Sequence, residues 1–418
     1  MDEPVFLQPN RPSPKSDPKP EHKPNPKPGK EPEPKKSRRV FKFLLRLTAL
    51  LAVLAAALVL MLLVVFRDRL NLDSVKRWFH YRSLTISDNG RAESFAYDGD
   101  LNCAFAVLDG DLLVCSNHAI SLYSGSGTRY IHESVNMENP VVHTNGTLAV
   151  VYDAGGSALY VLGQRALVWS AAGLEGILSA RLNRNGQLTV VTQASGYRGM
   201  VTVYDAAYRP LMSVNLTSAF VMDAALSDDG YTLATLTAGQ KDGAFNTGLE
   251  LYAMNYSSGS YQADVSCSLG SGVALDLRHT LSAVWALSDR GLTVTGHDGQ
   301  TVWVDWSNRY LRRYTLSGDG FAVVLLGRYR AGSQAELWAV DAQGGRRTLE
   351  LSEQVLSIAA AGRYLAVLTG DRLDIYTDEM ELYSSLKGTQ GARTVLLMQD
   401  GSAILISADS AGFYVPQR

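Results

Sequence analysis

The stretch Val141–Asp153, VVHTNGTLAVVYD, carries the pattern that decides the fold of this chain. Two apolar segments flank Asn145 and Gly146, and an Asn-Gly pair supplies the positive φ angles that a tight turn between antiparallel strands requires. Two short apolar runs joined by such a turn are typical of a β-hairpin. The same pattern recurs along the chain, so this hairpin is one copy of a repeat.

The hairpin occurs eight times, and its turn positions lie 36 to 50 residues apart. These positions are Gly110, Gly146, Gly186, Gly230, Thr280, Gly320, Gly362 and Gly401. A second pattern follows each copy, and its first strand has an aromatic residue near its end, except in the fifth copy, which has Val294. The aromatic residues are Tyr123, Tyr160, Tyr204, Tyr252, Trp338, Tyr376 and Tyr414. Each copy therefore predicts four short strands, named A to D here.

Repeated antiparallel units of this length predict an all-β fold, an eight-bladed β-propeller over residues 92–418. Seven blades are the alternative, because the fifth copy lacks both the turn glycine and the aromatic residue. A pair of β-sandwiches would show no fixed period of this length, and the coils of a β-helix are shorter. We expect the repeated aromatic side chains to pack between blades. The eighth copy ends after strand C, so residues 92–97, AESFAY, are expected to supply its outer strand and close the ring.

A membrane anchor is predicted at Leu47–Phe66, twenty residues with no charged side chain. A helix of that length spans roughly 30 Å, the thickness of the hydrocarbon layer. Residues 40–66 are therefore assigned to one transmembrane helix. Residues 1–46 carry 12 Lys and Arg against 6 Asp and Glu, which predicts a cytoplasmic N-terminus and an extracytoplasmic propeller in the cell membrane. A cleaved secretory signal is the alternative, although the apolar run is long for one.

The segments on either side of this helix are predicted to differ in structure. Residues 1–39 hold 11 of the 14 prolines and few apolar side chains, so we expect a disordered cytoplasmic tail that acts as a spacer, a ligand for a proline-reading domain or a tether to the inner leaflet. Residues 67–91 form a juxtamembrane stalk. Apolar residues at helical spacing, with Trp78 and Tyr81 beside them, predict either an interfacial helix with aromatic anchors at the headgroups or a plain helical stalk.

Charge and cysteine usage narrow the function classes. Removing the net +6 of the tail from the whole chain's −2 leaves −8 for residues 47–418, and a nucleic-acid-binding domain would instead show a basic stripe. The chain has three cysteines, too few for a disulfide framework. Cys103 and Cys115 could face each other across a hairpin, but buried free thiols are the favoured interpretation.

No catalytic or cofactor motif is found in the sequence. The seven histidines show no metal-binding spacing, there is no Cys-x-x-Cys pair, and neither a nucleophile elbow nor a phosphate-binding loop has the helix that it needs. We therefore expect a protein without a cofactor that is not an enzyme. A quinone-dependent dehydrogenase or a lyase built on the same fold is the alternative.

The candidate binding residues lie in three long connections between strands B and C. These connections are Ala194–Gly199, Ala238–Gly248 and Gly327–Ser333, in copies three, four and six. Exposed aromatic residues beside arginine are typical of protein-binding anchors, whereas variable loop length alone is the simpler interpretation. The candidate residues are Tyr197, Arg198, Lys241, Asp242, Phe245, Arg328, Tyr329 and Arg330.

The layout resembles uncharacterised envelope proteins of Gram-positive bacteria, which combine a basic tail, one membrane anchor and an extracytoplasmic propeller with degenerate quinoprotein-like or WD40-like repeats. The strings VYDAGG at 151–156 and WAVDAQGG at 338–345 carry this resemblance. The family has no assigned activity that the resemblance could imply. The missing catalytic residues and the three long connections favour a non-catalytic binding or scaffold module of the cell envelope, with an envelope protein as partner. Quinoprotein dehydrogenases repeat a docking motif, Ala-x-Asp-x-x-x-Gly-x-x-x-Trp, in their blades, and this chain does not repeat it.

Overall fold

The computed structural model of the chain describes residues 45–55, 57, 77, 81–82, 84–100, 102–241, 243–254, 263–306 and 308–417. Residues 45–55 and Ala57 are helical, and within the described residues no helix is long and apolar enough to cross a membrane. The rest of the span predicted at Leu47–Phe66, the tail at 1–39 and most of the stalk at 67–91 lie outside the described residues.

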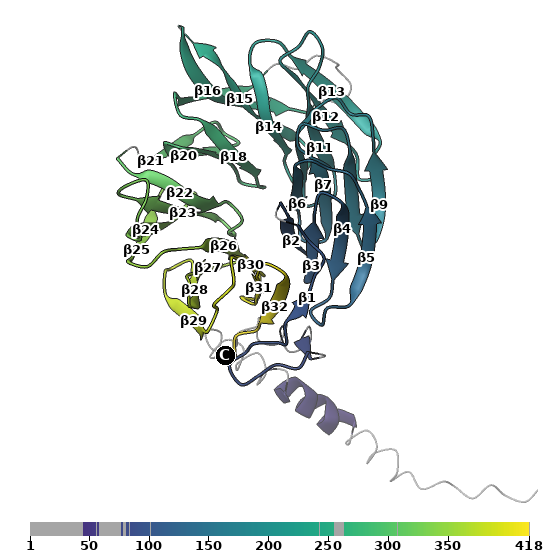
Figure 1. Cartoon of the computed structure of the whole chain (residues 1–418), viewed down its shortest axis with the longest axis vertical. Coiled ribbons are helices and arrows are strands. Elements are labelled where there is room, and N and C mark those ends of the chain that lie inside the picture. Colours follow the sequence, from purple (N-terminus) through teal and green to yellow (C-terminus); the bar gives the residue numbers. More distant parts are fainter. Residues whose placement is uncertain are drawn as a thin grey trace, which may run out of the picture. The chain divides into compact units, whose positions relative to one another are not determined.

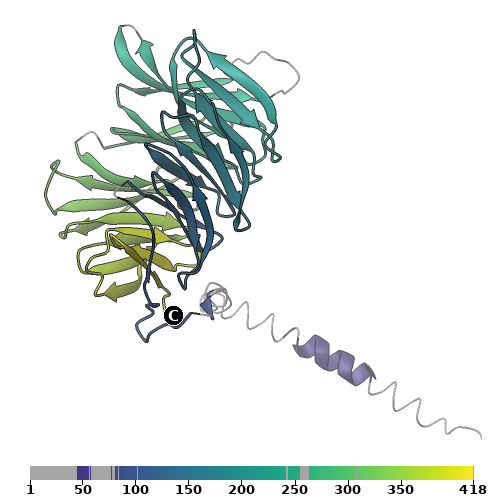
Figure 2. The same ribbon diagram turned by 45° about the vertical axis from the view of Figure 1, so that its right-hand side comes forward.

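Eight four-stranded antiparallel sheets follow one another around a common axis in sequence order (Figures 1 and 2). Each sheet is one blade, and the strands run from innermost A to outermost D in chain order. The fifth copy forms a complete sheet like the others, so the chain is an eight-bladed β-propeller and the seven-bladed alternative is wrong. The prediction of an all-β propeller is confirmed.

The strands of blades 1 to 4 all belong to consecutive hairpins. Blade 1 consists of β2 (Ala104–Leu108), β3 (Asp111–Cys115), β4 (Ala119–Tyr123) and β5 (Arg129–Ser134). Blade 2 consists of β6 (Pro140–Thr144), β7 (Leu148–Asp153), β8 (Leu159–Gly163) and β9 (Ala166–Ala171). Blade 3 consists of β10 (Ile177–Leu182), β11 (Leu188–Thr192), β12 (Gly199–Tyr204) and β13 (Pro210–Leu216). Blade 4 consists of β14 (Phe220–Leu226), β15 (Thr232–Lys241), β16 (Ala244–Ala253) and β17 (Val265–Gly270).

Blades 5 to 7 repeat this order, and blade 8 takes its outer strand from the other end of the chain. Blade 5 consists of β18 (Ala274–His279), β19 (Ala283–Ser288), β20 (Gly291–Gly296) and β21 (Thr301–Asp305). Blade 6 consists of β22 (Tyr310–Thr315), β23 (Phe321–Gly327), β24 (Ala335–Asp341) and β25 (Arg346–Leu351). Blade 7 consists of β26 (Ser357–Ala361), β27 (Tyr364–Leu368), β28 (Arg372–Thr377) and β29 (Leu382–Lys387). Blade 8 consists of β30 (Thr394–Leu397), β31 (Ala403–Ile406), β32 (Ser410–Tyr414) and β1 (Phe95–Ala96).

The position of a strand in its blade determines its residue pattern. Every residue of the B strands β11, β19 and β23 is buried, because both faces of a blade pack against neighbouring blades, and most residues of these strands are apolar. The outer strands β9 and β25 instead alternate exposed and half-buried residues. Burial on both faces therefore ends at the rim of the propeller, where side chains are free to be polar.

Each of the eight interfaces between neighbouring blades has its own hydrophobic cluster, so the core is a closed ring of eight small cores. The seven repeated aromatic side chains all lie in these clusters, each packed against the preceding blade. Tyr414 of blade 8, for example, packs with Tyr364 and Ala366 of blade 7. The prediction that these aromatic residues pack between blades is confirmed.

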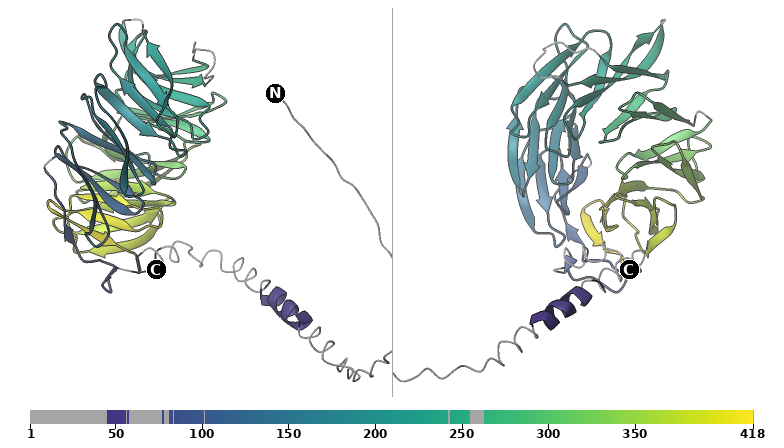
Figure 3. Two further views of the ribbon diagram at one scale, coloured as in Figure 1. Left: turned by 90° about the vertical axis from the view of Figure 1, so that its right-hand side faces the viewer. Right: turned by 180° about the vertical axis from the view of Figure 1, so that it is seen from behind.

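Blade 8 is completed by the start of the propeller, as the sequence predicted. Strand β1 pairs antiparallel with β32, with Phe95 opposite Ala411 and Ala96 opposite Ser410. The Val415 amide also donates to the Gly90 carbonyl at 2.8 Å. Figure 3 shows the C-terminal end beside the segment that leads into β1. Two ends of the sequence therefore share one sheet, and no strand edge of the ring is left open there.

The described residues Arg77 and Tyr81 do not behave as the predicted headgroup anchor. Tyr81 is buried, with its hydroxyl 3.1 Å from the Met398 sulfur and its ring beside Phe413. Arg77 is also buried and donates to the Asp400 carbonyl at 2.7 Å and to the Tyr383 hydroxyl at 2.8 Å. The aromatic anchor assigned to Tyr81 is therefore wrong, because this side chain packs in the hydrophobic cluster between blades 8 and 1. Trp78 lies outside the described residues.

All three cysteines are free thiols. Cys115 is fully buried in β3, which raises the pKa of its thiol through loss of solvation. Cys103 lies just before β2 and is half-buried, and Cys267 is half-buried in β17. The favoured interpretation of unpaired thiols is confirmed, although full burial holds only for Cys115.

Candidate functional site

The strand order places the connections of every blade on two faces. The B–C and D–A connections lie on one face, called the loop face here, and the A–B and C–D turns lie on the other, called the turn face. The three predicted B–C connections therefore all lie on the loop face, in blades 3, 4 and 6. Asp400 and Tyr383, which hold Arg77, lie on the turn face of blades 7 and 8.

The connection of blade 3 is a loop, as predicted, and runs from the end of β11 to Gly199. The Tyr197 side chain is 47% exposed. The Arg198 guanidinium lies 4.6 Å from the centre of the Phe220 ring, and the Arg198 amide donates to the Leu216 carbonyl at 2.7 Å. Arg198 is therefore fixed between blades 3 and 4 with its charge on an exposed aromatic ring.

The connection predicted at Ala238–Gly248 is not a loop. Strands β15 and β16 continue their ladder through it as far as the pair Lys241 and Ala244. Gly, Gln, Lys and Asn in this stretch suggested a loop, but residues 238–241 pair one to one with residues 244–247. Phe245 pairs with Gln240 and is 48% exposed. Asp242 lies outside the described residues, and so does the side chain of Lys241.

The connection of blade 6 is a loop over residues 328–334, and a residue that the sequence did not point to supports it. Arg312 of β22 donates to the carbonyls of Tyr329 at 2.8 Å and Gly332 at 2.6 Å. Gly327 leaves room for this arginine, since a Cβ at Gly327 would overlap the guanidinium. Tyr329 is 65% exposed, and the guanidinium of Arg330 lies 5.5 Å from the Tyr310 ring centre. Arg328 is exposed beside them.

The structure brings the connections of blades 3 and 4 together at Phe220, whereas no described contact joins the loop of blade 6 to them. Sequence reasoning missed the apolar residues that begin the inner strands of blades 3 to 6. These exposed side chains are Leu178, Phe220, Met222, Val273, Leu275 and Tyr310. These residues lie on the loop face because each A strand begins there. No short sequence motif around them indicates this position.

A buried ion-pair network joins three inner strands below these residues. Arg181 of β10 contacts Asp223 of β14 and Asp276 of β18, each at 2.5 Å. Burial alone would lower the pKa of Arg181, but the two carboxylates raise it above its usual value. Burial raises the pKa of Asp276, which Arg181 partly offsets. Since the guanidinium holds a carboxylate from each of two neighbouring inner strands, we interpret the network as structural support for these strands.

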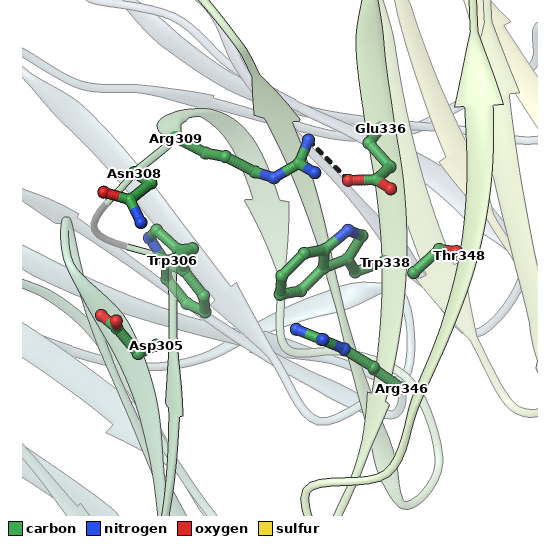
Figure 4. Close-up of a pocket in the computed structure, with 8 residues that line it drawn as sticks. All are labelled: Asp305, Trp306, Asn308, Arg309, Glu336, Trp338, Arg346 and Thr348. Carbon is green, nitrogen blue, oxygen red and sulfur yellow. Dashed lines mark ion pairs between the residues drawn. The ribbon is translucent and has the colours of Figure 1, made fainter.

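A polar pocket lies between blades 5 and 6, in a region that sequence reasoning left out (Figure 4). Its volume is about 440 Å³. The residues that line it are Asp305, Trp306, Asn308, Arg309, Glu336, Trp338, Arg346 and Thr348. Trp338 is the repeated aromatic residue of blade 6, and it is the one tryptophan among seven aromatics that are otherwise tyrosines. That substitution is the only sequence signal for the pocket.

Two tryptophans and two arginines define the geometry of this pocket. The Trp306 indole donates to the Asp289 carbonyl at 3.0 Å, which fixes its ring against blade 5. Arg309 pairs with Glu336 at 2.6 Å. The guanidinium groups of Arg309 and Arg346 lie 5.7 and 4.6 Å from the Trp338 ring centre, and Figure 4 shows them on opposite sides of that ring. Across the described part of the chain, no group of three or more His, Cys, Asp or Glu residues could hold a metal ion.

Comparisons with known proteins agree with the fold and assign no activity. The C-terminal WD40 domain of Sif2 has 12% identity and a TM-score of 0.50, covering 74% of this chain and 93% of that one. Apo AztD from Citrobacter koseri has 11% identity and a TM-score of 0.50, covering 78% and 93%. At these identities the likeness concerns the fold alone. No curated protein matches the chain. Over residues 86–268, which span blades 1 to 4, the chain is similar to DUF5711, a family of unknown function.

Proposed function

We propose that this protein is a non-catalytic binding module of the cell envelope whose protein partner docks on the loop face of blades 3 to 6. The observation that carries the proposal is the concentration of exposed large apolar side chains on this face. Tyr197, Phe245 and Tyr329 come from the B–C connections, and six more come from the inner strands. Exposed apolar residues that gather in one region mark interaction sites, whereas scattered ones are normal.

The chemistry of this face suggests what the partner offers. Arg198 and Arg330 each lie over an exposed aromatic ring, and Arg328 is exposed beside the second pair. Arginine held on an aromatic ring keeps its donors ordered, so it loses little freedom when it meets an acceptor. A partner surface with apolar side chains and nearby carboxylates fits this arrangement.

The proposed placement rests on the sequence. The apolar run at Leu47–Phe66 and the basic flank before it support a single membrane helix with the propeller outside the cell. The chain reaches the propeller through Arg77 and Tyr81 on the turn face. The loop face is therefore the face remote from the point where the chain joins the propeller, which leaves it free for a partner.

The proposal is tested by capture of crosslinked partners from membranes. Tyr197, Phe245, Tyr329 and Arg330 are replaced together by alanine, and we expect at least about a 30-fold loss of capture, as for the removal of an interface hot spot. The matched control replaces Val168, Leu211 and Leu382, exposed apolar residues of outer strands, and should capture normally. Equal capture by wild type and the loop-face variant, with unchanged thermal melts, would reject this face as the binding site.

A further inference from the structure

The two arginines of the pocket between blades 5 and 6 differ in their partners. Arg309 is neutralised by Glu336, but the guanidinium of Arg346 forms no hydrogen bond or ion pair with any of the described residues. Its guanidinium is instead stacked on the Trp338 ring at 4.6 Å. Asp305 lies on the opposite side of the pocket (Figure 4). A planar cation held in this way presents its N–H groups edge-on to the cavity, in the geometry that pairs with a carboxylate through two hydrogen bonds.

A second group in the pocket also lacks a partner. Trp338 is 4% exposed, and its indole nitrogen has no acceptor among the described residues. Figure 4 shows this nitrogen on the ring edge that faces Arg309 and Glu336. A buried donor without an acceptor is unfavourable, and an oxygen atom of a ligand or of a water molecule would satisfy it. Arg309, whose side chain is 38% exposed, is the residue that would move to let an oxygen atom approach.

We propose that this pocket binds a small hydroxylated organic acid, a molecule of the uronic-acid type. The carboxylate pairs with Arg346, and an oxygen at the other end of the molecule accepts from the Trp338 indole and from Arg309. Hydroxyl groups between them meet the polar side chains of Asn308 and Thr348. The volume of about 440 Å³ falls in the range of small-molecule sites.

One end of this pocket lies in the D–A connection between blades 5 and 6, on the loop face, but the pocket shares none of the candidate anchors of the docking proposal. The candidate anchors Tyr197, Phe245 and Tyr329 do not line the pocket. The two proposals therefore fail independently, because loss of partner capture and loss of acid binding are measured with different variants and different readouts.

Binding is tested on the full chain, which is kept in a mild detergent. Its six tryptophans are replaced by 5-fluorotryptophan, and fluorine NMR is the readout. The probe is D-glucuronate, and W306F and W338F assign the two pocket resonances. We expect D-glucuronate to shift both resonances saturably and to leave that of Trp169, between blades 2 and 3, unchanged. D-glucose, which lacks the carboxylate, succinate, which lacks the hydroxyls, and inorganic phosphate should each bind at least tenfold more weakly.

Variants decide whether the guanidinium carries the binding. Arg346→Gln should weaken D-glucuronate binding at least tenfold. Arg346→Lys keeps the charge but not the planar guanidinium, so its affinity should lie between those of the wild type and Arg346→Gln. The matched control is Arg347→Gln, which removes the neighbouring arginine that pairs with Glu379 outside the pocket. The absence of a saturable shift at D-glucuronate concentrations on the order of 10 mM would overturn the proposal. So would equal affinity in Arg346→Gln, or phosphate binding more tightly than D-glucuronate.

Discussion

The interface between blades 8 and 1 and the interface between blades 5 and 6 have the same architecture but are packed with different kinds of side chain. At the first, Tyr81, Phe413 and neighbouring apolar side chains from the first and the last segments of the propeller fill the space. At the second, the inner part is apolar, while Arg309, Glu336 and Arg346 line a cavity towards the rim. The ring needs every inner interface to be filled, whereas its outer positions tolerate polar residues and room for a ligand.

The deletion of residues 85–98 should have the largest effect, because it removes β1 and the segment that pairs with Tyr414 and Val415. Strand β32 would become an open edge at the interface that closes the ring. We expect loss of solubility and of a cooperative thermal transition. Deletion of residues 1–39, the predicted tail, is the control and should leave the melt unchanged. A soluble 85–98 deletion with a normal melt would show that the ring closes without this segment.

Phe413→Ala should destabilise the closing interface by about 3–5 kcal/mol, since the ring is 1% exposed and packs with Tyr81. Urea denaturation of the variant measures this loss. A loss below about 1 kcal/mol would mean that the interface relaxes around the cavity and is less tightly filled than the structure indicates.

A polar group inside an interface should make stability depend on pH. His279 reaches the Ala225 carbonyl across blades 4 and 5, and burial lowers its pKa to about 4. The unfolded chain takes up this proton near pH 6.5, so acidification favours unfolding. Between pH 7.5 and pH 5 we expect about 2 kcal/mol of stability to be lost through this residue.

The measurement compares urea denaturation at the two pH values for the wild type and His279→Gln. The variant should lose about 2 kcal/mol less on acidification. Burial also lowers the pKa of His143, to about 3, so some pH dependence should persist in the variant. His118→Gln, at an exposed position, is the control. An identical pH response in His279→Gln and the wild type would contradict this assignment.

Arg309→Met should have the smallest effect on stability, because it breaks only a partly exposed ion pair with Glu336 at the outer part of the interface between blades 5 and 6. Such pairs contribute about 0–1 kcal/mol, so the melt should barely change. A loss of more than about 2 kcal/mol would show that the polar residues of the pocket hold blades 5 and 6 together, and the contrast with the closing interface would disappear.

The repeat was readable from the sequence because each hairpin needs local signals. Gly146 and its equivalents supply the positive φ of the A–B turns, and Tyr414 and its equivalents recur at the position that packs on the preceding blade. Even the pairing of Phe95 with β32 followed from counting strands. The loops of blades 3 and 6 were also found, since their residues interrupt two apolar runs.

Tertiary structure alone decided which residues from distant parts of the sequence are in contact. Polar residues made Ala238–Gly248 look like a loop, but its backbone hydrogen bonds are satisfied by the partner strand, and composition does not report pairing. Tyr81 looked like a headgroup anchor, but its environment is set by Met398 and Phe413, more than 300 residues away. The pocket depends on Trp338 and Arg346 facing blade 5 across a gap. A repeat pattern specifies each blade, whereas the space left between two blades depends on side chains from both.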